Sequence, residues 1–133
     1  MISCGGSDDD VTISTNGLFV TVGENGIILT SSDGTTWDSR NSSTTYNLVG
    51  ITHANGIFVT VGDNGTILTS SDGISWTLRT SGTTNQLNES TYGNGIFVTI
   101  GEQGSIYSSI DGTSWTSRTS GVDFTLNGIN YKE

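Results

Sequence analysis

The sequence predicts an all-β fold built from repeated blades, each made of four short antiparallel strands. Landmark residues recur every 39 residues in three copies, as Trp37, Trp76 and Trp115 show. The chain contains 19 Gly and no Pro, a composition that favours short strands and tight turns over helices. Because four strands in about 40 to 45 residues form one blade of a β-propeller, the chain is predicted to be part of a propeller.

The individual strands are clearest in the middle copy. The run 57–61 is nearly continuously apolar, which is typical of a strand covered on both faces. Residues 62–65 follow with an Asn-Gly pair, which readily takes the positive φ angles of a hairpin turn. Further strands are predicted at 67–69 and 76–79, and the segment 48–53 completes the four.

The two ends of the repeat region differ from the copies between them. Residues 126–129 repeat the pattern of 48–51 two periods later, so one extra C-terminal strand is predicted to begin a fourth blade. The corresponding segment before the first copy, 9–14, matches that strand poorly. Three blades do not close a ring, since propellers typically have about 4 to 8.

Two explanations of this incomplete ring remain open. The C-terminal strand of one chain could complete the first blade of another, so that a homodimer forms a six-bladed ring. Alternatively, the chain is a truncated gene product or a fragment of a longer propeller.

Each copy also carries a short Ser-x-Asp-Gly motif followed by Trp. These motifs resemble the Asp-box of BNR-repeat β-propellers, a superfamily that includes sialidases, xyloglucan hydrolases, sortilin-type receptors and photosystem II stability/assembly factors. The resemblance covers nearly the whole chain after Asp10, although each motif has one residue fewer between Asp and Trp than the common box. The residues assigned to the structural Asp-boxes are Ser31, Asp33, Gly34, Trp37, Ser70, Asp72, Gly73, Trp76, Ser109, Asp111, Gly112 and Trp115.

The chemistry of this motif indicates a folding device. An Asp carboxylate accepts hydrogen bonds from backbone N–H groups just ahead of it, Gly tolerates a left-handed backbone, and Trp packs beneath the turn. One carboxylate per turn falls short of the six to eight oxygen ligands that calcium prefers. No metal site and no cofactor are therefore expected.

Catalysis is not expected either. The resemblance to sialidases implies an arginine triad on one ligand, but Arg40, Arg79 and Arg118 occupy the same position in each copy, so the propeller would hold them apart. They are interpreted as blade-edge or interblade residues. No pair of facing carboxylates stands out, and His53 is the only histidine. The four tyrosines could line a sugar-binding surface or pack between blades: Tyr46, Tyr92, Tyr107 and Tyr131.

Charge and the N-terminal segment indicate partners and location. The net charge of −9 would repel nucleic acid and anionic membranes. Residues 1–10 are interpreted as an acidic Gly/Ser/Asp tether ahead of a repeat domain at 11–133. The residues around Cys4 resemble the end of a bacterial lipoprotein signal, which would place the protein outside the cytoplasm with a lipid on Cys4 as its membrane contact. The alternative is a disordered acidic tail with a free thiol.

These observations predict a non-catalytic binding or scaffold module, secreted or lipid-anchored, that recognises a protein or glycan. The loops that differ most among the copies, 41–47, 80–86 and 119–125, are the recognition candidates. The alternative is a fragment of a glycan-processing propeller enzyme of the sialidase or xyloglucan-hydrolase type.

Overall fold

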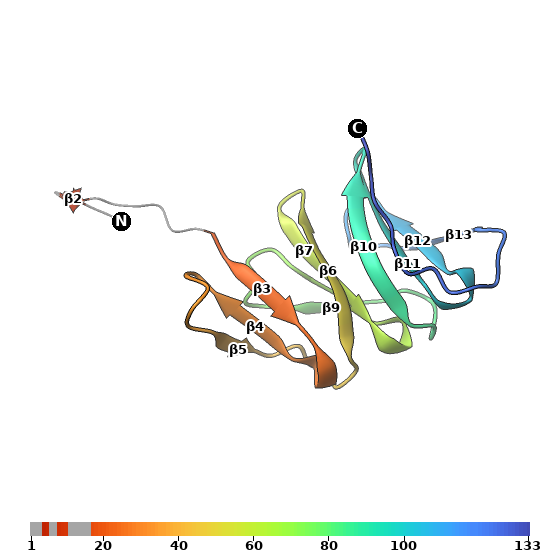
Figure 1. The fold of residues 1–133 in the computed structure, drawn as a ribbon, viewed down its shortest axis with the longest axis horizontal. Coiled ribbons are helices and arrows are strands. Elements are labelled where there is room, and N and C mark those ends of the chain that lie inside the picture. The colour runs from red at the N-terminus through yellow and green to blue at the C-terminus, as the bar shows by residue number, and fades with distance from the viewer. Residues whose placement is uncertain (1–3, 6–7, 11–16) are drawn as a thin grey trace.

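The computed structural model is all-β and describes residues 4–5, 8–10 and 17–133. Three antiparallel sheets stand side by side, one for each repeat (Figure 1). The first contains β3 (Phe19–Val22), β4 (Ile28–Ser31) and β5 (Asp38–Arg40). The second contains β6 (Leu48–Ala54), β7 (Ile57–Gly62), β8 (Ile67–Ser70) and β9 (Thr77–Arg79). The third contains β10 (Leu87–Gly93), β11 (Ile96–Gly101), β12 (Ile106–Ser109) and β13 (Thr116–Arg118).

The second and third sheets confirm the predicted four-stranded blade. Each follows a simple meander in which sequential strands pair, because short turns join neighbours. The predicted turn at 62–65 is a single 3₁₀ turn, η2 (Asp63–Gly65), and Asn64 has a φ of 57°. Equivalent turns, η1 (Glu24–Gly26) and η3 (Glu102–Gly104), lie in the other two blades.

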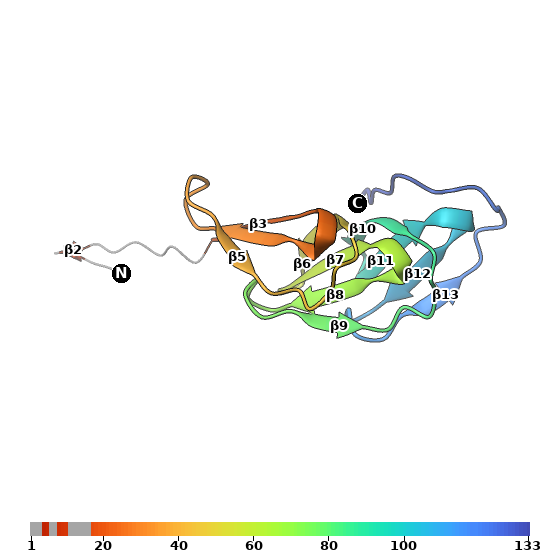
Figure 2. The ribbon, with the colours of Figure 1, turned by 90° about the horizontal axis from the view of Figure 1, so that it is seen from below.

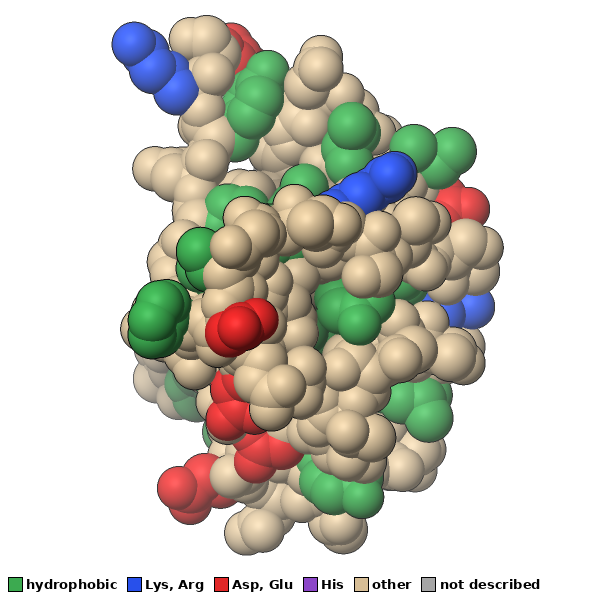
Figure 3. Space-filling model, turned by 90° about the vertical axis from the view of Figure 1, so that its right-hand side faces the viewer, with side chains coloured by type: hydrophobic (Ala, Val, Ile, Leu, Met, Phe, Trp, Pro, Cys, Tyr) green, Lys and Arg blue, Asp and Glu red, His purple; other side chains and the backbone are tan. Residues whose placement is uncertain are grey.

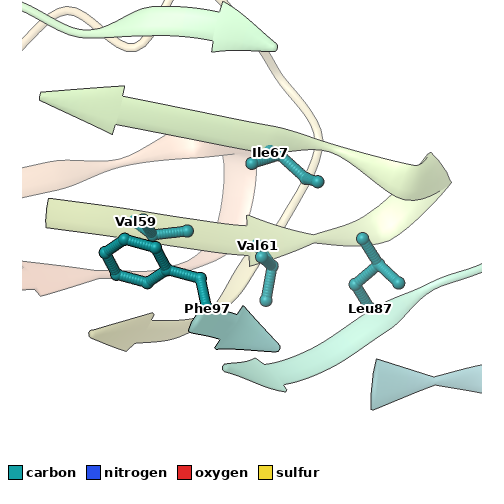
Figure 4. Packing of buried hydrophobic residues seen from close by; sticks show 5 residues of the cluster. All are labelled: Val59, Val61, Ile67, Leu87 and Phe97. Carbon is teal, nitrogen blue, oxygen red and sulfur yellow. The ribbon is translucent and has the colours of Figure 1, made fainter. Parts of the chain in front are cut away.

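The core lies between the blades. The cluster between the second and third blades contains Val59, Val61, Ile67, Leu87 and Phe97, all of them fully buried (Figure 4). The cluster between the first and second blades contains Ile28, Leu48 and Leu68. Ile28 and Leu48 in one cluster are equivalent in the repeat frame to Ile67 and Leu87 in the other, so each blade is stabilised by a similar contact with its neighbour.

The strands that lead each blade also meet across the blade boundary. Thr52 on β6 donates its hydroxyl to the carbonyl of Ser90 on β10 at 2.6 Å, and the Ser90 hydroxyl donates to Thr52 Oγ1 at 2.9 Å. We call β6 and β10 the inner strands of their blades. Figure 2 shows from a second direction that the three sheets follow one another along the molecule.

The first blade has three strands in the described part of the chain, one fewer than the other two. The residues that precede it, β2 (Asp8–Asp10), pair with β1 (Cys4–Gly5) and not with β3. The predicted poor match of 9–14 to an inner strand agrees with this pairing at Asp9 and Asp10, whereas residues 11–14 lie outside the described residues.

The predicted extra C-terminal strand requires a correction. Residues 126–129 are not in a strand, because no described strand lies on their outer side to pair with them. The segment nevertheless occupies the position that the 39-residue repeat predicts for it. Leu126 N–H donates to the Gly101 carbonyl at 3.0 Å, as Leu48 N–H donates to the Gly23 carbonyl at 2.9 Å two periods earlier.

The predicted tether at 1–10 is described only at β1 and β2. The side chain of Cys4, proposed as a lipid attachment site, lies outside the described residues. Within the part of the chain that the structure does describe, no helix is long and apolar enough to span a bilayer.

Substitution of Gly50 tests how closely the inner strands approach. A Cβ at Gly50 would lie 2.8 Å from the Asn88 carbonyl oxygen and 2.9 Å from Glu89 Cα, both backbone atoms of β10. We expect Gly50→Ala to lower the free energy of unfolding by about 1–3 kcal/mol, because β6 and β10 must separate. The measurement is urea unfolding followed by tryptophan fluorescence.

The control for this substitution is Gly17→Ala, since a Cβ at Gly17 meets nothing within 4 Å. Its effect should stay within about 0.5 kcal/mol. Equal losses in the two variants would contradict the close interblade approach.

Candidate functional site

The Ser-Asp-Gly turns join the last two strands of each blade. In the second turn the Ser70 hydroxyl donates to Asp72 Oδ1 at 3.0 Å and accepts the Gly73 N–H at 2.7 Å. Asp72 Oδ1 also accepts the N–H groups of Ile74 at 2.8 Å and Ser75 at 3.0 Å. One carboxylate oxygen thus organises the whole turn.

The first and third turns repeat this network. Asp33 Oδ1 accepts the N–H groups of Thr35 and Thr36 at 2.8 and 2.9 Å. Asp111 Oδ1 accepts those of Thr113 and Ser114 at 2.8 and 3.2 Å. Ser31 and Ser109 hold the preceding part of each turn, with 2.7 Å bonds from the N–H groups of Gly34 and Gly112.

These hydrogen bonds act on the ionisation of the three carboxyl groups. The N–H groups of Thr36 and then Thr35 hold the pKa of Asp33 below its ordinary value of 3.8. Those of Ile74 and Ser75 lower the pKa of Asp72, and those of Thr113 and Ser114 lower the pKa of Asp111. Each turn therefore stabilises the ionised form of its Asp, which accepts the hydrogen bonds.

The turns also contact the neighbouring blade. A Cβ at Gly73 would lie 2.6 Å from Leu18 Cδ2 of the first blade, and one at Gly112 would lie 2.6 Å from Ile57 Cδ1 of the second. The Trp76 and Trp115 indoles donate at 2.9 Å to the carbonyls of those same glycines, and both rings pack on the interblade clusters. The motif thus fixes a turn and a blade contact together.

The structure places the remaining candidate residues within single blades. Each arginine donates Nε to a hydroxyl on the adjacent strand of its own blade: Arg40 to Thr30, Arg79 to Thr69 and Arg118 to Ser108. Each of these bonds lies within one blade, so the three arginines do not converge on one site. Across the described residues, no group of three or more His, Cys, Asp or Glu side chains could hold a metal ion.

The histidine and tyrosines divide between packing and surface. His53 packs against Phe58 in a tilted arrangement with ring centroids 4.4 Å apart, and Tyr92 packs against Phe97 in the same way at 4.6 Å. Tyr107 packs on the core between the second and third blades. Tyr46 and Tyr131 are 49% and 43% exposed, so only these two offer much ring surface.

Two of the three variable loops, 41–47 and 80–86, form the walls of one groove of about 730 Å³. Both loops contain the same pair of internal hydrogen bonds, made by a buried serine. Ser42 and Ser81 are buried, and each hydroxyl accepts an N–H from the Thr two residues on and donates to its carbonyl. These hydrogen bonds fix the backbone of each loop, so the outward-facing side chains can differ between the copies.

The lining of this groove combines hydroxyl groups, backbone and two apolar side chains. Tyr46 projects from one loop, and Leu78 on β9 is 62% exposed. Among the described residues that line the groove, Arg79 is the only charged one. A second cavity of about 470 Å³ adjoins it along residues 41–46. The third loop, 119–125, does not line either cavity.

Leu78 is the groove residue that the sequence reasoning missed. Its signal was present in the repeat, because the equivalent residues in the other copies are Ser39 and Ser117. The other copies form the same blade with Ser at this position, so the fold does not require an apolar residue there. An exposed Leu at this position indicates a role at the surface.

Comparison with known proteins supports the fold. No family model and no curated protein match the chain. A solved structure described as YCF48 bound to D1 peptide, a β-propeller, matches with a TM-score of 0.68 and 22% sequence identity. The match covers 80% of this chain and 37% of that one, so the chain spans well under half of the structure it resembles. The chain is therefore an all-β partial propeller.

Acid unfolding tests the three turns. Because the folded-state pKa of each turn Asp lies below 3.8, its contribution to stability is present above that pH and is lost as pH falls through the lower, folded value. We expect Asp72→Asn, which keeps an acceptor oxygen but removes the charge, to weaken the loss of stability in acid. The measurement is urea unfolding between neutral pH and about pH 2.5.

The matched control is Asp123→Asn, which removes a carboxylate from the exposed loop 119–125. It should leave the acid dependence of the wild-type chain intact. An unchanged acid dependence in Asp72→Asn would show that the turn carboxylate does not contribute to it.

Proposed function

We propose that this chain is a non-catalytic propeller module that binds an extended segment of a protein partner in the groove between loops 41–47 and 80–86. The groove itself carries the proposal. It is walled by the loops that differ most among otherwise similar blades, and surface variation on a repeated scaffold is typical of binding sites. The structural neighbour is a protein bound to a peptide, which supports the same class of partner.

The lining suggests what such a segment needs. Tyr46 and Leu78 would pack against an apolar side chain, since both are largely exposed in the groove. Loop hydroxyls and backbone groups would pair with the extended peptide backbone. The Arg79 guanidinium would donate to a carboxylate or carbonyl of the partner, because Arg presents several donors in a planar fork.

The proposal also covers location and assembly. A lipid on Cys4 would hold the protein outside the cytoplasm, with residues 1–10 as the tether. Intact-mass analysis of the protein from membranes should then show a lipidated Cys as its first residue.

A homodimer would close a six-bladed ring, since the three described blades leave an uncovered blade face at each end. The proposal that the chain is non-catalytic would be overturned by hydrolysis of a fluorogenic sialoside or of xyloglucan by the purified chain.

Peptide selection tests the groove. Random dodecapeptides displayed on phage are selected against the purified chain, and the best synthetic peptide is titrated by fluorescence anisotropy. We expect Tyr46→Ala and Leu78→Ser each to weaken binding about tenfold or more, which corresponds to about 1.4 kcal/mol. Both side chains are exposed, so the variants should remain folded.

Ile110→Ser is the matched control, because Ile110 is 75% exposed and does not line the groove. It should bind the peptide as the wild-type chain does. Equal affinity of all three variants would place peptide binding elsewhere. Selective capture of an oligosaccharide on a glycan array, lost in Tyr46→Ala, would replace the peptide by a glycan as ligand of the same groove.

A further inference from the structure

In the described part of the chain, the first blade begins with a strand edge that has no partner. Its sheet begins at β3, whereas the other two blades begin with an inner strand, β6 or β10. On β3, Phe19 is 58% exposed, but its equivalents Phe58 and Phe97 are partly and fully buried. Among the described residues, nothing pairs with this edge of β3. An unpaired edge with an exposed aromatic side chain favours the addition of a strand.

The opposite end of the molecule presents an inner strand without a sheet. The segment 126–131 lies against β10 where the inner strand of a next blade would lie (Figure 1). Besides the Leu126 bond to Gly101, Asn88 Nδ2 donates to the Leu126 carbonyl at 2.9 Å, and the Tyr131 ring contacts Gly93. Among the described residues, these contacts of the segment are all with the third blade.

The two ends are complementary in register. In the complete blades the inner strand places an aromatic ring on the Phe of the second strand: His53 faces Phe58, and Tyr92 faces Phe97. Moved by whole periods, the same register places Tyr131 opposite Phe19. Both of these side chains are substantially exposed in the single chain, at 43% and 58%.

A hydroxyl contact repeats in the same way. Thr60 donates to the Gly50 carbonyl at 2.8 Å, and Thr99 donates to the Glu89 carbonyl at 2.9 Å. The equivalent donor on the first blade is Thr21, which is exposed, and the equivalent acceptor is the carbonyl of Gly128. The C-terminal segment thus carries an acceptor equivalent to those of Thr60 and Thr99, and the described residues of the first blade contain none at that position.

The blade faces are complementary as well. Val59 is fully buried beneath the Gly112 turn of the following blade, whereas its equivalent on the third blade, Val98, is only partly buried. Trp37 is 40% exposed, because no described blade precedes its own. Figure 3 views the molecule from the side of the third blade, where hydrophobic side chains are scattered among polar ones.

We propose that residues 126–131 of one copy form the inner strand of the first blade of a second copy, and that two copies exchange these strands to close a ring of six blades. This inference rests on the ring-closing homodimer proposed above and specifies its contacts. Two copies are required because six is the one multiple of three within the usual range of about 4 to 8 blades. The contact is head-to-tail, and it closes because each copy supplies one strand and receives one.

Cross-linking between mixed copies tests the register. One sample carries Phe19→Cys and the other Tyr131→Cys, both in a Cys4→Ser background. Facing Cα atoms of antiparallel strands are about 4.5–5.5 Å apart, within the usual reach of a disulfide. After mixing and mild oxidation, we expect a disulfide-linked dimer on a non-reducing gel that neither sample gives alone.

The matched control replaces Tyr131→Cys by Asn127→Cys, which lies on the same segment about four residues out of register. It should form little or no cross-linked dimer with Phe19→Cys. Equal cross-linking in both mixtures would overturn the proposed pairing.

Light scattering separates strand exchange from the ring itself. The full chain should give twice its mass of 13.9 kDa, and deletion of residues 126–133 should give a monomer. A dimer that survives the deletion would overturn strand exchange and leave the ring standing. A monomeric full chain, or polymers that grow with concentration, would overturn both. Peptide binding in the groove uses loops of the first two blades, so its success or failure is read independently in the truncated chain.

Discussion

Each blade of this protein is stable only because its apolar side chains are covered by the next blade. A single antiparallel sheet of three or four short strands has no interior of its own, so burial requires a second sheet against one of its faces. Val59, Val61 and Ile67 are completely buried because they meet Leu87 and Phe97 of the following blade. Because the sequence repeats, the same kind of interface forms between each pair of neighbouring blades.

The need for each blade to pack against the next explains the Ser-Asp-Gly turns. The carboxylate fixes the turn through local backbone bonds, and the fixed turn then holds Gly73 against Leu18 and Trp76 against the cluster between the first two blades. A bulkier residue than Gly at that point would push the blades apart. The three acidic side chains are thus explained by the geometry of blade packing, and their lowered pKa values follow from hydrogen bonds that the turn already needs.

The repeat made much of this structure predictable. A 39-residue period, with Trp and Arg in fixed positions, is visible in the letters of the chain, and strand positions follow from the apolar runs between the Gly turns. The phase of Leu126 was predictable for the same reason. Its failure to form a strand was not, because strand formation depends on a partner in space, which no local pattern encodes.

The groove was predictable only in outline. Loop variation pointed to 41–47, 80–86 and 119–125 alike, but the structure joins the first two and leaves the third apart. Loops 80–86 and 119–125 also follow adjacent blades, yet no residue of 119–125 lines the groove, so repeat position alone does not predict which loops meet. Leu78 contributes from a strand, where its exposure depends on the angle between neighbouring sheets and not on its own sequence neighbourhood.

The graded burial of equivalent residues provides a separate line of reasoning about the ends. Phe19, Phe58 and Phe97 have the same place in their blades, yet their side chains pass from exposed through partly buried to fully buried along the chain. The residue type is constant, and the gradient follows what lies on the side of the preceding blade: no described blade for Phe19, the three-stranded first blade for Phe58 and the four-stranded second blade for Phe97. A closed ring would give all three the surroundings of Phe97, because every blade would then follow a complete four-stranded blade. The exposed rings at the two ends are thus the cost in hydrophobic burial of leaving the ring open, and that cost favours any arrangement that brings the ends together.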